Sequence, residues 1–231
     1  MRGWPWANSR EMNEMSVIEP MGGQLNILPR SDVEKIHGAA MEVLKKVGIK
    51  VWSESGLRLF TGAGAEVDQN AMTVRMDESF VLDIVRKAPS SFKFYGRNPR
   101  YKLMMGRKRV HFSLCGQGVK VHDLEGKVRL ATLSDLESMA LIGDYCENIH
   151  HVSMMTTPMD IPPESMHIQA LWGLLRNSSK TVDGFTHGAR AADETIQLGA
   201  IVRGSVEELA KKPFLLGFTN PVSPLQLSKE L

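Results

Sequence analysis

The chain has 231 residues, of which 42% are hydrophobic and 23% charged, values that are ordinary for a globular protein able to bury its own core. Its formal net charge of +2 is too small to predict, by itself, binding to nucleic acid or to an anionic membrane. The N-terminus lacks the apolar run of a secretory signal, and no stretch has the ~20 apolar residues of a membrane helix. We therefore expect a cytoplasmic protein in which the two cysteines, Cys115 and Cys146, are reduced.

Residues 1–27 show no hydrophobic periodicity, and two interpretations stay open: an irregular arm that packs on a neighbouring subunit, or a disordered segment. The first predicted helix begins at Ser31, because Ser31 and Glu34 have the spacing of a capping box. Apolar residues then recur at helical spacing until Gly48, which predicts a left-handed stop. The next predicted elements are a strand at 49–51 and a helix at about 53–61.

A third helix is predicted to begin after Asp77 and to end at Pro89. Between Phe92 and Leu130 the hydrophobic period changes to two, and glycine-containing turns separate the segments, which predicts short antiparallel strands. The alternating pairs are Phe92/Phe94, Leu103/Met105, Val110/Phe112, Val119/Val121 and Val128/Leu130. Residues 28–131 together predict a compact α+β region.

From residue 132 onward the sequence predicts alternating helices and strands. Ser134 and Glu137 predict a second capping box at the start of a helix. The elements predicted after it are a strand at 149–155, a helix at 163–177, a strand at 180–186, a helix at 189–203, a short helix at 205–212 and a strand at 214–218. The strand centres lie roughly 30 residues apart, as in βαβ units.

A closed (β/α)8 barrel needs eight such units in about 250 residues. We therefore expect residues 132–231 to form the first part of a (β/α)8 TIM-type barrel that is incomplete, with residues 226–231 opening the next helix. The predicted fold class is α/β, with the N-terminal α+β region preceding the truncated barrel. The unpaired strand edge at 214–218 predicts self-association or poor solubility.

Several short segments, each weak alone, keep a consistent order and spacing from about residue 28 to residue 231. They are Ile36–Leu44 with Val47–Ile49, Gly62–Asp68, Ala88–Pro89, Tyr95–Pro99, Ala131–Leu136, Glu147–Ile149 and Asn220–Leu225. Taken together, these segments resemble the trimethylamine methyltransferase family, whose members have a (β/α)8-type barrel preceded by an α+β extension. The two patterns read from the residues agree with that architecture.

The resemblance implies a function. Members of this family move a methyl group from a methylated amine, such as trimethylamine or the quaternary amine glycine betaine, to the cobalt of a corrinoid held by a separate partner protein. The expected cofactor is therefore a cobalamin-type corrinoid presented by that partner, with none bound covalently to this chain. Family chains are about twice as long as this one, so the alternative is a truncated, non-catalytic fragment that acts at most as a binding or assembly module.

In a barrel, functional residues follow the strands at their carboxyl ends. By that position we predict Asp160, His187 and Asn220 as substrate-binding residues, while the catalytic residues stay unassigned. Each has a structural alternative: Asp160 as a cap of the helix near residue 163, His187 as a loop histidine, and Asn220 as a turn residue. His150 and His151 lie next to each other on a predicted strand and should face opposite sides, so we expect no metal site there.

Seven basic residues and no acidic residue lie between Phe92 and Phe112, interleaved with aromatic residues. A solvated basic hairpin is the favoured interpretation. An electrostatic docking surface for an acidic corrinoid protein comes next, and single-stranded nucleic acid is the least favoured partner.

Overall fold

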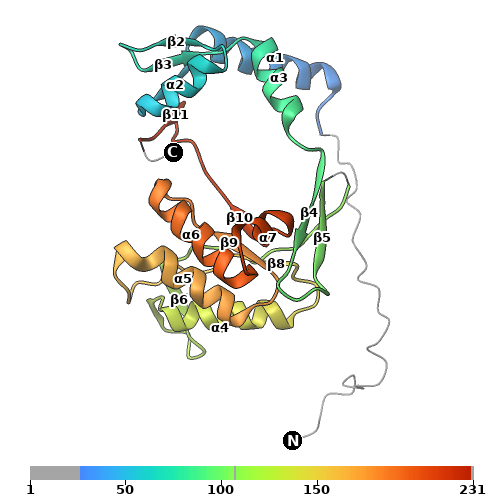
Figure 1. The fold of residues 1–231 in the computed structure, drawn as a ribbon, viewed down its shortest axis with the longest axis vertical. Coiled ribbons are helices and arrows are strands. Elements are labelled where there is room, and N and C mark those ends of the chain that lie inside the picture. The colour runs from blue at the N-terminus through green and yellow to red at the C-terminus, as the bar shows by residue number, and fades with distance from the viewer. Residues whose placement is uncertain (1–26, 107, 230–231) are drawn as a thin grey trace, which may run out of the picture.

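A small sheet packed with helices forms the N-terminal part of the fold, at the top of Figure 1. The structure, a computed structural model, describes residues 27–106 and 108–229, so the predicted arm at 1–27 lies outside it apart from Ile27. The sheet has the strand order β11-β1-β3-β2, and buried Val51, Leu57 and Val74 form its core. Its elements are α1 (Arg30–Lys46), β1 (Ile49–Val51), α2 (Glu54–Gly62), β2 (Glu66–Asp68), β3 (Thr73–Arg75), α3 (Glu78–Lys87) and β11 (Gln226–Leu227).

Local side chains set the helix boundaries in this part. Asp77 caps α3 as predicted, by accepting a hydrogen bond from the backbone N–H of Phe80. The capping box predicted at Ser31 is wrong, because α1 begins one residue earlier, with Pro29 at its N-cap and no side-chain cap. Gly48 has φ +76° and ends α1 as predicted; a Cβ there would lie 2.4 Å from the Val74 carbonyl oxygen.

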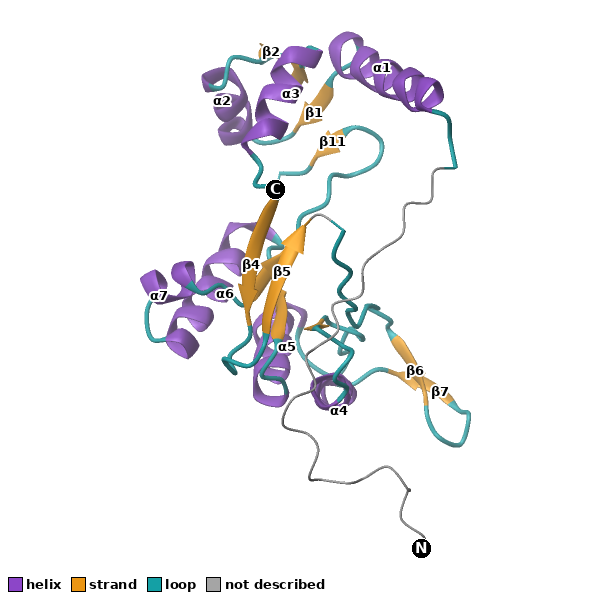
Figure 2. Ribbon diagram, turned by 90° about the vertical axis from the view of Figure 1, so that its right-hand side faces the viewer, coloured by secondary structure: helices purple, strands orange, loops and turns teal. Residues whose placement is uncertain are grey.

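The hairpin of β4 (Ser91–Tyr95) and β5 (Lys102–Gly106) follows, antiparallel as the sequence predicted. Figure 2 shows these two strands side by side between the upper and lower groups of helices. The Tyr95 N–H donates to the Pro213 carbonyl at 2.9 Å, and the Asn98 N–H donates to the Ser179 carbonyl at 3.1 Å. Because Ser179 and Pro213 precede two strands of the lower sheet, the hairpin covers the amino ends of those strands.

The lower part of the molecule is a parallel sheet of order β10-β9-β8 with helices on one face (Figure 1). Buried Leu136, Leu171, Leu174, Val182 and Phe214 fill the layer between sheet and helices. The predicted helix at 163–177 is confirmed, and the other predicted elements of this part lie within a few residues of their expected bounds. These elements are β6 (Lys120–His122), β7 (Val128–Leu130), α4 (Leu133–Tyr145), β8 (His151–Val152), α5 (Pro163–Asn177), β9 (Thr181–Gly184), α6 (Gly188–Arg203), α7 (Val206–Lys211) and β10 (Leu215–Gly217).

The segment 112–118 lies parallel to β8, beside the strand edge opposite β9. Two isolated bridges place it there, Ser113 with His151 and Gly118 with Thr156. The antiparallel strand predicted at Val110/Phe112 is therefore wrong. Gly116 permits the close approach, since a Cβ on it would lie 2.2 Å from the Met155 carbonyl oxygen.

The C-terminal segment returns to the N-terminal sheet. The helix predicted to begin at 226 is wrong, because Gln226 and Leu227 form β11, which pairs in parallel with β1. The Trp52 indole N–H donates to the Gln226 side-chain oxygen at 2.8 Å, which fixes this pairing from the side.

In the part of the chain that the structure describes, the sheets are small and no closed barrel is present. A parallel sheet with helices on one face and a hairpin across its amino ends is compatible with part of a (β/α)8 barrel, and the incomplete barrel stays a prediction. Among the described helices, none is long and apolar enough to cross a membrane.

Candidate functional site

A cavity of about 470 Å³ lies between the helix-free face of the parallel sheet and the β4–β5 hairpin. Phe94, Leu103 and Met105 of the hairpin form one wall. The opposite wall and the rim come from the sheet and from the segments at its carboxyl ends, through His151, Ser153, Thr181, Asp183, Leu216, Thr186, His187 and Phe218. A cavity of this size suits a small organic ligand.

Strand alternation decides which side chains reach the cavity. Val152 and Val182 are fully buried against the helices, so their neighbours His151, Thr181 and Asp183 face the other side, where the cavity lies. Polar residues therefore line the face of the sheet that would be the interior of a barrel.

His151 and Asp183 form the main polar contact in the cavity wall. His151 Nε2 lies 2.9 Å from Asp183 Oδ1, and His151 Nδ1 lies 2.9 Å from the Thr181 hydroxyl. The other carboxylate oxygen, Asp183 Oδ2, accepts the backbone N–H of Met154 at 3.1 Å. A carboxylate can only accept, so Nε2 carries a proton, and the side chains of His151 and Asp183 are both held in one orientation.

The rest of the lining combines apolar and aromatic residues with uncharged polar side chains such as Ser113, Gln117, Ser153 and Thr186. Phe94, Phe185 and Phe218 contribute rings, and the Phe185 and His187 rings lie 6.4 Å apart between centroids. Within the described residues, the lining contains a single acidic side chain, Asp183, and neither lysine nor arginine. Aromatic faces with one carboxylate suit a small, weakly hydrated cation.

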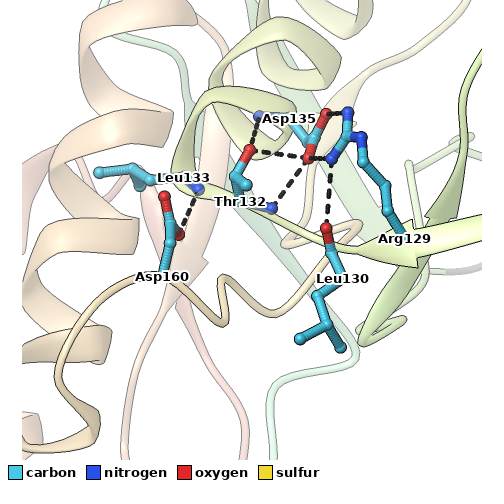
Figure 3. A network of polar contacts seen from close by, with 6 residues as sticks. All are labelled: Arg129, Leu130, Thr132, Leu133, Asp135 and Asp160. Atoms are coloured by element: carbon cyan, nitrogen blue, oxygen red, sulfur yellow. Dashed lines mark hydrogen bonds and ion pairs between the residues drawn. The ribbon is translucent and has the colours of Figure 1, made fainter.

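Of the three residues predicted from the sequence, His187 alone lines this cavity, at the N-cap position of α6. Asn220 is exposed and is not part of the lining. Asp160 lies outside it too: its Oδ1 accepts the backbone N–H of Leu133 at 2.9 Å, so it caps α4 and not the helix near residue 163 (Figure 3). The substrate role of these three residues stays a prediction.

Sequence reasoning missed His151 and Asp183. The available signal was a polar residue at every second position of a parallel strand whose other residues are apolar, as in Thr181-Val182-Asp183. His150 and His151 have different surroundings, since buried His150 accepts the Phe112 N–H through Nδ1 at 3.1 Å while His151 faces the cavity. In the described residues there is no group of three or more histidine, cysteine, aspartate or glutamate side chains that could hold a metal ion.

A second polar network joins the β6–β7 hairpin to the start of α4 (Figure 3). Arg129 donates from both terminal nitrogens to Asp135, at 2.6 and 2.7 Å. Thr132 and Asp135 form a capping box, so the box predicted at Ser134 and Glu137 is wrong by two residues. The Arg129 guanidinium, with the Thr132 hydroxyl and N–H, holds the pKa of the Asp135 carboxyl well below its usual range.

Two basic residues of the segment between Phe92 and Phe112, Arg97 and Arg100, have partners elsewhere in the chain. The Arg97 guanidinium donates to the carbonyl oxygens of Leu175 and Ser178 at the end of α5. Arg100 lies 3.6 Å from Glu147. The Arg97 contacts hold the hairpin beside α5, whereas the Arg100–Glu147 pair is exposed at the surface; binding of a partner to the basic segment stays a prediction.

Comparison with known proteins gives a consistent result. Residues 6–231 match the family described as trimethylamine methyltransferase (MTTB). The chain is 30% identical over 208 residues to glycine betaine methyltransferase of Desulfitobacterium hafniense (strain Y51), covering 89% of this chain and 43% of that protein. It is 29% identical to trimethylamine methyltransferase MttB of D. hafniense (strain DSM 10664 / DCB-2), covering 96% and 45%. It is 30% identical to trimethylamine methyltransferase MttB1 of Methanosarcina mazei, covering 90% and 43%. The chain thus spans less than half the length of these relatives.

Proposed function

The chain belongs to the trimethylamine methyltransferase family, and we propose that it supplies part of an enzyme that moves a methyl group from a methylated amine to the cobalt of a corrinoid. The amine would be trimethylamine or a quaternary amine such as glycine betaine, the substrates in the names of its relatives. The corrinoid would be held by a separate protein.

One observation carries this proposal: the chemistry of the cavity. Its walls combine the rings of Phe94, Phe185 and Phe218 with the carboxylate of Asp183, and none of its described lining residues is a lysine or arginine. A methylated ammonium ion has an apolar surface and a single positive charge, so it needs aromatic contact and a counter-charge. A phosphate ligand, or a carboxylate ligand without an ammonium group, would find no lysine or arginine among these described residues to bind it.

The residues of this chain would bind and orient the amine. The corrinoid supplies the nucleophile, and this cavity of about 470 Å³ is the size of a small-ligand site, so a macrocycle carried by a partner must approach from outside. Transfer by in-line displacement from a bound cation depends on alignment and on exclusion of water. The hairpin residues Phe94 and Leu103 cover the amino-end side of the cavity and exclude water there.

The test combines binding with methyl transfer. The 231-residue chain is titrated with trimethylamine and with glycine betaine, and is then mixed with a reduced corrinoid protein, whose absorbance reports methylation. We expect binding of at least one amine, and transfer once a polypeptide carrying the rest of the barrel is added. Failure to bind either amine would overturn the assignment of the cavity.

The alternative is a non-catalytic fragment that serves as a binding or assembly module. The observation behind it is that the chain covers 43% to 45% of the relatives quoted above, while its described sheets form no closed barrel. Amine binding without transfer in any combination of the chains would support this alternative against the enzyme.

A further inference from the structure

Asp183 places a carboxylate in the wall of a cavity whose described lining has neither lysine nor arginine. We propose that Asp183 is the charge-selecting residue of this site: its carboxylate admits ligands with a positively charged, fully substituted nitrogen and disfavours uncharged molecules of the same shape. The inference rests on the proposed function for the nature of the ligand. Beyond the proposed function, it assigns to one residue the preference for a cation over an uncharged molecule of the same shape.

The hydrogen bonds of Asp183 hold its carboxylate in place but do not neutralise it. One oxygen accepts from His151 Nε2 and the other from the Met154 backbone N–H. In the neutral form of His151, Nε2 donates to Asp183 and Nδ1 accepts the Thr181 hydroxyl proton at 2.9 Å, a proton that this hydroxyl would otherwise donate to the His150 carbonyl at 3.3 Å. The pair then keeps one negative charge.

Part of that carboxylate is open to the cavity. The Asp183 side chain is 23% exposed, against 12% for His151, and both residues line the cavity. Lys180, which precedes β9, does not compensate the charge of Asp183. Its ammonium group is directed to the carbonyl oxygens of Gly143 and Cys146 at the end of α4. A carboxylate in a partly enclosed cavity interacts with a ligand cation more strongly than one on an open surface, since less water screens it.

A substitution can remove this charge while keeping the contacts. In Asp183→Asn, the amide oxygen can accept the Met154 N–H and the amide nitrogen can donate to His151 Nε2. His151 then carries its proton on Nδ1 and donates it to the Thr181 hydroxyl, which donates in turn to the His150 carbonyl at 3.3 Å. No heavy atom has to move, so the variant is expected to fold.

The experiment compares two probes that differ in charge alone: choline and its uncharged isostere 3,3-dimethylbutan-1-ol. Binding of each to the 231-residue chain is measured by calorimetry or by NMR titration. For Asp183→Asn we expect the Kd of choline to rise about tenfold or more, since removing a partly shielded counter-charge costs at least that much. The Kd of the alcohol should stay within about twofold.

Two further variants make the result specific. Asp193→Asn removes the same charge from the exposed surface of α6, where Asp193 contacts Gln197, and should leave both Kd values unchanged. Asp183→Glu keeps the charge and should retain the preference for choline, even if both ligands bind less tightly.

The outcomes separate the two proposals. If the unmodified chain prefers choline and Asp183→Asn keeps that preference, Asp183 is not the selecting residue, while the proposed function is unaffected. If the unmodified chain binds choline no better than the alcohol, the cavity does not recognise ammonium, and the proposed function loses the observation that carries it.

Discussion

Lys180 is a fully buried charged residue with a structural partner. Its side chain crosses to the last turn of α4, where the ammonium group donates to the carbonyl oxygens of Gly143 at 2.8 Å and Cys146 at 2.7 Å. It also lies 5.3 Å from the centre of the Tyr101 ring. The contact with Gly143 satisfies a carbonyl group at the C-terminus of α4, where a positive charge is favourable, and the Cys146 carbonyl also accepts the Ile149 N–H at 3.0 Å.

We predict that Lys180→Met lowers the free energy of unfolding by about 1–3 kcal/mol, because the buried Gly143 carbonyl loses its side-chain donor and the Cys146 carbonyl keeps only the Ile149 N–H. Chemical denaturation followed by circular dichroism measures this. Lys211→Met, which removes a lysine from an exposed surface pair with Glu208, is the matched control and should change stability little. A stability loss no larger than that of the control would show that the buried contacts of Lys180 are not stabilising.

Lys180 should also make the free energy of unfolding depend on pH in the alkaline range. Burial lowers the pKa of Lys180 below its ordinary value of 10.5, so between the lowered value and 10.5 the unfolded chain binds the proton and the folded chain does not. Stability therefore rises with pH across that window. The stability difference between the unmodified chain and Lys180→Met should widen as pH rises towards 10.5. Tyr101, whose pKa burial raises above 10.0, contributes a falling stability above pH 10 in both proteins.

A substitution of Asp160 can show whether this residue binds substrate or caps α4. Its carboxylate accepts the Leu133 N–H at the first turn of α4, and a cap of this kind contributes about 0.5–2 kcal/mol. We predict that Asp160→Ala lowers stability by an amount in that range and leaves the Kd of methylated amines unchanged. Thermal melts and amine titrations on one protein preparation measure both. A selective loss of amine binding at unchanged stability would instead support the substrate role predicted from the sequence.

The junction between the β6–β7 hairpin and α4 depends on Asp135. This carboxylate joins Arg129 of β7 to the capping box of α4. An isolated two-stranded hairpin is marginally stable at best, so its orientation relies on this anchor. Asp135→Asn should therefore lower the free energy of unfolding by about 1–2 kcal/mol at neutral pH.

Acid should remove that difference. The pKa of Asp135 is held below its ordinary value of 3.8 by Arg129. Its contribution is therefore complete above 3.8 and is lost as pH falls through the lowered value. Denaturation curves of the two proteins at pH 7 and in steps below pH 4 measure this convergence. Equal stabilities at pH 7 would contradict the role of the anchor.

Local signals in the sequence predicted the elements well, whereas long-range pairing escaped them. Pro163 as the first helical residue and the polar end at Asn177 were enough to bound α5. The sequence placed the capping box at Ser134 and Glu137, but it is formed by Thr132 and Asp135. Asp135 is also held by Arg129, which belongs to another element and which local spacing does not reveal. β11 could not be predicted, since it exists only because β1, far earlier in the chain, offers a strand edge on which Lys50 pairs with Gln226. The Trp52 side chain, 174 residues before Gln226, adds a hydrogen bond to it.

The candidate site shows the same difference between local signals, which the sequence contains, and long-range contacts, which it does not reveal. Position after a strand was a sufficient signal for His187, which lines the cavity. It was insufficient for Asp160, whose partner in space is the N–H of Leu133 on another element. To predict His151 and Asp183 as site residues, one would need to know that β8 and β9 are neighbours and that both bury their valines on the helix side. That information lies in strand register, which the sequence of either strand does not contain.

At the scale of the whole molecule, the hairpin and the parallel sheet make the cavity together. The turn end of the hairpin is attached to the amino ends of β9 and β10 by backbone hydrogen bonds from Tyr95 and Asn98, and to the end of α5 by the Arg97 guanidinium. The opposite side of the sheet is filled by helices. Among the described residues, no further strand pairs with the outer edge of β10.

The β10 edge predicts self-association of the 231-residue chain. β10 is the terminal strand in the order β10-β9-β8, and Phe218, just beyond it, is 68% exposed. An apolar strand edge with unsatisfied backbone groups pairs readily with another chain. We expect sedimentation velocity to show oligomers that grow with concentration, and Phe218→Lys to reduce them because a charge on the edge opposes pairing. Val206→Lys, at a 53% exposed position on α7, should have no such effect. A concentration-independent monomer for the unmodified chain would show that this edge is protected.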